Sequence, residues 1–143
     1  MLSYPKTLLP RSVPLLLVAL AGCSEGPKVV PVSGTLTYKG HPITNAFVDF
    51  LPEDGRPSWG ETDPEGRFKL NYDRKRDGAL VGKHRVSVRM RQETRAEQEA
   101  VMQGKRPRMS KEMQEFFDKY SSEKSKIDVE IIDKTTDLKL DWQ

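Results

Sequence analysis

The residue with the clearest chemistry in this sequence is Cys23, the only cysteine of the chain. It directly follows Leu20, Ala21 and Gly22, and the four residues match the bacterial lipobox pattern Leu-Ala/Ser-Gly/Ala-Cys. In that pattern the small residues let the backbone enter a peptidase cleft, and the thiol forms a thioether to diacylglycerol. We therefore expect cleavage between Gly22 and Cys23 and lipidation of Cys23.

The residues before Cys23 have the composition of a lipoprotein signal peptide. Residues 1–22 carry Lys6 and Arg11, no acid, and an apolar run after Arg11 that is too short for a membrane span of about 20 residues. An ordinary secretory signal or a buried N-terminal helix is the alternative. Residues 23–30 are the expected lipidated tether, and its five polar residues 24–28 reach no more than about 18 Å. Removing residues 1–22 lowers the net charge from +3 to +1.

No other residues show a pattern typical of catalysis. The chain has no Gly-x-Ser-x-Gly motif, and of its two histidines His41 lies in a predicted turn and His84 on the inward face of a predicted strand. Glu61, Asp63 and Glu65 flank one turn, but their spacing is not that of a calcium loop. We therefore expect no catalytic residue, no metal site and no cofactor, and we predict that the protein is not an enzyme.

One surface has residue types suited to ligand binding. Four basic residues alternate along residues 82–91 and share one strand face: Lys83, Arg85, Arg89 and Arg91. They could contact anionic headgroups or an acidic polymer, or be neutralised by acids on neighbouring strands, and the mature charge of +1 favours neutralisation. Trp59 and Phe47 are expected to project outward and could stack on sugars. Trp59, Arg85 and Arg89 are therefore the candidate ligand surface.

The elements that must position these residues are short strands. Ten Gly and ten Pro among 143 residues predict many turns, and 36% hydrophobic residues suffice for one small core. Alternating patterns predict seven strands, at residues 32–38, 46–52, 58–62, 67–72, 82–91, 127–131 and 138–142, with helical residues at 92–119. A turn is expected at 133–137. The predicted core comprises Val48, Phe50, Phe68, Leu70, Val86, Val88, Val129, Ile131 and Leu140.

Four segments, in the same order along the chain, resemble segments of a known group of domains. Residues 31–43, 45–50, 62–68 and 82–88 resemble the Val-x-Gly, Ala-x-Val-x-Phe, Thr-Asp-x-x-Gly-x-Phe and Gly-x-His-x-Val-x-Val segments of carboxypeptidase regulatory-like and transthyretin-like domains. The resemblance implies an all-β, seven-stranded Greek-key β-sandwich (prealbumin-like) over residues 31–143, with a short helical insertion between strands five and six. The related purine-breakdown hydrolases need a C-terminal Tyr-Arg-Gly-Ser that this chain lacks.

These observations lead to two functional expectations. The first is a lipid-anchored protein of the bacterial cell envelope, facing the periplasm or on the outer membrane, whose sandwich is a non-catalytic structural or interaction module for another envelope protein. The alternative is a module that binds envelope polysaccharide through exposed aromatics and the basic strand face. The membrane is the expected partner through the lipid anchor, and nucleic acid is excluded because export separates the protein from it.

Overall fold

The computed structural model describes residues 26–105 and 109–143, and in this part the chain is mostly β. The predicted all-β class is thereby confirmed. The signal peptide, the cleavage site at Gly22 and the lipidation site Cys23 lie outside the described residues.

One sheet has four antiparallel strands in the order β5-β4-β8-β9. They are β5 (Ser58–Glu61), β4 (Ala46–Pro52), β8 (Gly82–Met90) and β9 (Ile127–Ile131). The long strand β8 lies between β4 and β9 and pairs antiparallel with both. Alternation along β4 and β8 turns one set of side chains toward the core and the other toward solvent.

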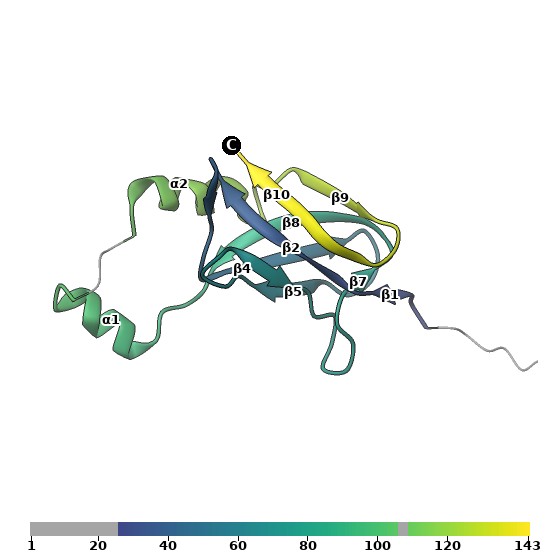
Figure 1. Ribbon diagram of the computed structural model, residues 1–143, viewed down its shortest axis with the longest axis horizontal. Coiled ribbons are helices and arrows are strands. Elements are labelled where there is room, and N and C mark those ends of the chain that lie inside the picture. Colours follow the sequence, from purple (N-terminus) through teal and green to yellow (C-terminus); the bar gives the residue numbers. More distant parts are fainter. Residues whose placement is uncertain (1–25, 106–108) are drawn as a thin grey trace, which may run out of the picture.

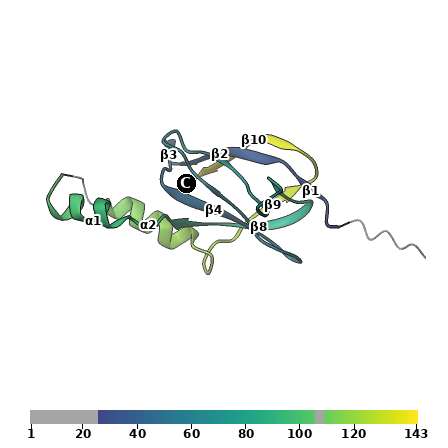
Figure 2. The ribbon, with the colours of Figure 1, turned by 90° about the horizontal axis from the view of Figure 1, so that it is seen from below.

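A second sheet covers the inner face of the first (Figures 1 and 2). Its central strand β2 (Val32–Tyr38) pairs with β3 (His41–Pro42), β6 (Arg67–Lys69) and β10 (Thr135–Trp142), and the pairing of β2 with β10 is parallel. At Gly34 a side chain could not be accommodated, because a Cβ there would lie 2.1 Å from the Leu138 carbonyl oxygen. The chain enters the domain through a two-residue pair, β1 (Val29–Val30) with β7 (Ala79–Leu80).

The apolar core lies between the two sheets. Phe50, Val86 and Val88 from the first sheet and Leu36 from the second are fully or almost fully buried. Eight of the nine predicted core residues are buried; the exception is Val129, which is only partly buried at the edge of the core. Burial of this kind stabilises a fold by roughly 1.5–3 kcal/mol per large apolar side chain.

Two helices follow β8, where the sequence predicted a helical insertion. The helix α1 (Arg95–Met102) begins after Thr94, which caps it, and buries no side chain. The helix α2 (Lys111–Tyr120) begins after Ser110 and buries Phe116 and Tyr120. Those two rings pack with Tyr38 and Trp142, so α2 closes the end of the sandwich where β2 and β10 finish.

The structure differs from the sequence prediction in four details, and the first is that the strand expected at residues 67–72 ends at Lys69. Three two-residue strands, β1, β3 and β7, raise the number of strands among the described residues to ten, and two residues are too few to show alternation. The turn expected at 133–137 is shorter, because β10 begins at Thr135. Met90 alternates with Val86 and Val88 along β8, but at the end of the strand it is 48% exposed.

Candidate functional site

The outer face of the sheet β5-β4-β8-β9 carries the predicted ligand surface. Strand register places Phe47 opposite Arg89, Asp49 opposite Trp59, and Arg85 opposite Asp128. Paired residues of antiparallel strands point to the same side, so these side chains share one face. We call the set Phe47, Asp49, Trp59, Arg85, Arg89 and Asp128 the outer face.

Two aromatic rings form the apolar part of the outer face. The rings of Phe47 and Trp59 meet edge to face, with centroids 5.8 Å apart and planes at 78°. Trp59 is 44% exposed, whereas Phe47 is partly covered by the Arg89 guanidinium, whose Cζ lies 4.3 Å from the ring centroid. The structure therefore brings Trp59 and Arg89 onto one surface, bridged by Phe47.

The two arginines of the outer face are paired with acids on neighbouring strands. Arg89 donates two hydrogen bonds to Asp49, at 2.7 and 3.3 Å, and Arg85 lies 3.5 Å from Asp128. The prediction that these arginines are neutralised across strands is thereby confirmed. Lys83 stands opposite Glu130 in register, but forms no ion pair within residues 26–105 and 109–143.

A buried hydroxyl lies beneath these charges. Ser87 stands opposite Asp49 and between Arg85 and Arg89 along β8, on the outward side, yet it is only 1% exposed. Its Oγ has no hydrogen-bond partner in the described part of the chain. The charged side chains thus cover the middle of the outer face.

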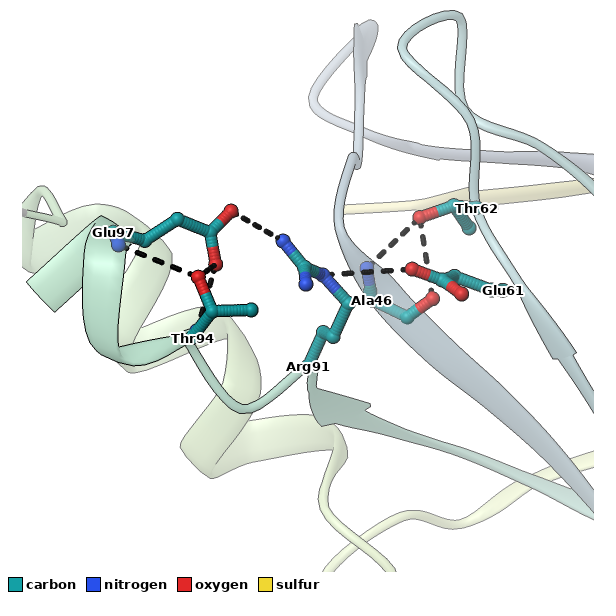
Figure 3. A network of polar contacts seen from close by, with 6 residues as sticks. All are labelled: Ala46, Glu61, Thr62, Arg91, Thr94 and Glu97. Atoms are coloured by element: carbon teal, nitrogen blue, oxygen red, sulfur yellow. Dashed lines mark hydrogen bonds and ion pairs between the residues drawn. The ribbon is translucent and has the colours of Figure 1, made fainter. Parts of the chain in front are cut away.

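Arg91 belongs to a separate network that joins the sheet to α1 (Figure 3). Its guanidinium donates a 2.7 Å hydrogen bond to Glu97 and lies 3.5 Å from Glu61 of β5. Hydrogen bonds from the Thr94 backbone, and then from Arg91 and the Thr94 hydroxyl, hold the pKa of Glu97 at about 2. Arg91 was expected on the basic strand face with Arg85 and Arg89, although Thr94-x-x-Glu97 is a capping-box signature that indicates the start of a helix here.

The two histidines do not come together. His41 is exposed on β3, and His84 is buried against the ring of Phe50. The Nε2 of His84 lies 2.7 Å from the Leu80 carbonyl oxygen, whereas Nδ1 has no partner among the described atoms. The expectation of a core histidine is confirmed, with only one of its two nitrogens satisfied.

The carboxylates around the 63–66 turn are each engaged by an arginine. Asp63 accepts hydrogen bonds from the backbone and the Nε of Arg67, Glu65 pairs with Arg67, and Glu61 with Arg91. Although burial opposes it, these bonds lower the pKa of Asp63. In residues 26–105 and 109–143, no group of three or more His, Cys, Asp or Glu side chains is placed to hold a metal ion.

Comparison with known proteins gives no relative. No family model, no curated protein and no solved structure matches this chain. Within the described residues, neither helix is long and apolar enough to cross a membrane.

Proposed function

We propose that this chain is a lipid-anchored protein of the bacterial cell envelope. The single observation that carries the proposal is the lipobox Leu20–Cys23 behind a basic, apolar leader, with the only cysteine of the chain at the modified position. Two or three acyl chains on Cys23 anchor stably, since each buried methylene contributes about 0.8 kcal/mol. The anchored domain faces the periplasm or sits on the outer membrane.

Replacement of the cysteine tests this proposal. In cells that receive an alkynyl fatty acid, the parent chain takes up the label and is cleaved before Cys23. The variant Cys23→Ala is expected to lose all label and to remain as the uncleaved precursor. Cys23→Ser is the matched control, because it keeps the size of the side chain and removes only the thiol. It is expected to behave like Cys23→Ala. Label that persists in either variant would overturn the proposal, since no other thiol exists.

The domain itself we propose to be a transthyretin-like Greek-key sandwich that acts as a structural or interaction module without catalysis, with another envelope protein as its partner. Two observations support this proposal. The seven longer strands lie at or near the positions that the alternating pattern predicts, and seven strands is the number that the resemblance implies. The arginines of the outer face are bound to carboxylates, and the two histidines lie on separate elements, so neither set forms a converging acid-base pair.

Crosslinking in intact cells tests the interaction module. A photocrosslinking residue in place of Arg89, which is 55% exposed on the outer face, should capture one discrete envelope protein. The same residue in place of Lys139, exposed on β10 of the opposite sheet, is the control and should capture a different set or nothing. Equal, diffuse crosslinks from both positions would contradict a specific interaction surface.

A second candidate function, binding of envelope polysaccharide, is favoured by one observation: Trp59 and Phe47 form an adjacent aromatic pair on an open face. Sugar rings stack on such aromatic faces, and Arg89 beside them can donate hydrogen bonds. Trp59→Ala should then weaken retention on immobilised envelope polysaccharide at least about tenfold, the size expected for one stacking contact. Ile132→Ala, exposed elsewhere, is the control. Equal retention of both variants would exclude this function.

A further inference from the structure

One end of the sandwich is fixed beside the point where the tether enters the domain. The Val81 amide donates to the Lys28 carbonyl at 3.1 Å, next to the β1–β7 pair. Two loops pack against that pair. A Cβ on Gly55 would lie 2.7 Å from Leu80 Cδ1, and one on Gly78 would lie 1.9 Å from the Val30 carbonyl oxygen. Loops 53–57 and 71–78 are therefore held at the tether end, where Figure 1 shows the long loop before β7 projecting from the sandwich.

These loops carry basic side chains that lack ion-pair partners. Arg56, Arg74 and Lys75 are exposed, line one open hollow of about 660 Å³, and form no ion pair within residues 26–105 and 109–143. The other two side chains of the hollow are paired, because Arg76 lies 2.8 Å from Asp73. We call Arg56, Arg74 and Lys75 the basic end.

The acids of these loops do not neutralise the basic end. Asp73 accepts hydrogen bonds from the Lys75 backbone and from Arg76, which lower its pKa, and Asp77 pairs with Lys69. Glu53 lines a different hollow, beside Lys83 and His84. Asp54 is exposed and subtracts one charge from the region. Neither Glu53 nor Asp54 forms an ion pair within the described residues, so three unpaired cations face solvent in a region that holds two unpaired acids, of which Glu53 lines the other hollow.

Trp59 adds an apolar element to the same end. It lines a hollow with Arg56, Arg74 and Asn71, and its backbone pairs with that of Asn71 at the base of the loop 71–78. An exposed indole next to arginines is typical of surfaces that rest at the headgroup level of a membrane. Trp59 thus marks the side of the basic end that such a surface would approach.

We propose that the basic end contacts anionic phospholipid headgroups and orients the anchored domain on the membrane. This inference rests on the proposed lipid anchor, since a tether of five residues, 24–28, keeps the end within about 18 Å of Cys23. Each cation near an anionic surface favours contact by about fivefold, so three favour it by about 100-fold before the opposing charges of Glu53 and Asp54 are subtracted. A preference of this size is too small to hold a free protein on a membrane. It is large enough to set the orientation of a domain that is already anchored at the surface.

The test uses a synthetic anchor, so that its result does not depend on acylation of the chain in cells. The protein used is residues 23–143, which contain every strand, helix and core residue that the structure describes. Its Cys23 is coupled to a maleimide lipid in vesicles that also contain a lipid with a nitroxide headgroup, which quenches tryptophan emission. With Trp142→Phe, Trp59 is the only tryptophan. We expect its emission to be strongly quenched on phosphatidylglycerol-containing vesicles and weakly on phosphatidylcholine alone.

A matched pair of triple variants decides the result. Arg56→Ala/Arg74→Ala/Lys75→Ala should reduce quenching to the level of neutral vesicles, as should about 1 M salt, where the Debye length is about 3 Å. Lys111→Ala/Lys124→Ala/Lys126→Ala removes the same charge from α2 and the loop after it and should change nothing. If Trp142→Phe destabilises the fold, the same comparison is made with Trp142 retained. Trp142 is buried, so the nitroxide quenches mainly the emission of Trp59. Equal quenching on both vesicle types, or equal effects of the two triples, would overturn the proposal.

Discussion

The Arg89 guanidinium is held by the Asp49 carboxylate across β4 and β8, with its Nε 2.7 Å and its Nη2 3.3 Å from the two carboxylate oxygens. The same guanidinium covers the ring of Phe47. An exposed pair of this kind contributes only about 0–1 kcal/mol to stability. Its larger effect is on the electrostatic potential of the outer face, because a cation that is paired with a carboxylate attracts an anionic partner only weakly. The outer face thus presents aromatic surface rather than free charge.

This pairing leads to a prediction for membrane binding without an anchor. Residues 24–143, which lack the modified cysteine, should bind anionic vesicles weakly or not at all at physiological salt. The three cations of the basic end contribute about 1 kcal/mol each, too little to retain a free domain. Co-sedimentation across a salt series measures this. Strong, salt-sensitive binding that is lost in Arg85→Ala/Arg89→Ala would show that the outer face is a headgroup site instead.

The core assignment predicts that one charge on β8 unfolds the domain. Val88 is 1% exposed and lies between the sheets, so Val88→Asp buries an unpaired carboxylate at a cost of several kcal/mol. Chemical denaturation of residues 24–143 measures the loss. Lys83→Asp, exposed on the same strand, is the control and should lose no more than about 1 kcal/mol, the size of a like-charge contact with Glu130 opposite it. A Val88→Asp variant that unfolds at the parent midpoint would mean that the faces of β8 are assigned wrongly.

The Glu97 network predicts a pH dependence for α1. The folded state holds the pKa of Glu97 at about 2, below its ordinary value of 4.5. A lowered carboxyl pKa stabilises the fold above about 4.5, and this contribution is lost as the pH falls toward 2. Amide chemical shifts of α1 should therefore follow a titration in that window.

The control for this titration lies on the same helix. Glu97→Gln should remove the pH response of α1, whereas Glu99→Gln should leave it in place, since Glu99 forms only an exposed pair with Arg95 at 3.3 Å. A response that persists in Glu97→Gln would assign the titration to another group.

The docking of α2 depends on Phe116. This ring is fully buried and stands within 4.9–5.9 Å of the rings of Tyr38, Tyr120 and Trp142. Phe116→Ala is expected to cost about 3–5 kcal/mol of unfolding free energy, because the cavity cannot be filled by its rigid aromatic neighbours. Met102→Ala on α1, where the side chain is 84% exposed, should change stability by less than about 0.5 kcal/mol. Similar losses for both would show that α2 is not part of the cooperative unit.

The sequence predicted accurately the strands in which apolar and polar residues alternate. Alternation placed β2 and β4 at the observed bounds. The low net charge favoured neutralisation of the basic strand face by acids on neighbouring strands, as is found for Arg85 and Arg89.

What the sequence could not show arises from contacts between distant segments. The parallel pairing of β10 with β2 joins residues about 100 positions apart, and no local pattern encodes it. The basic end depends on two loops that meet only because both pack on the β1–β7 pair. Arg91 was placed with the wrong neighbours for a related reason, since its partner Glu97 lies on a helix beyond the strand.

The intact mass of the mature protein shows whether Cys23 carries the proposed lipid anchor. The full chain is expressed in bacteria, extracted from the membrane fraction with detergent, and measured by mass spectrometry before and after hydrolysis of its ester bonds. The account predicts a chain that begins at Cys23 and carries a diacylglyceryl thioether, with or without a third acyl chain on the new amine. A chain that begins at any other residue, or one that begins at Cys23 with a free thiol, would contradict it.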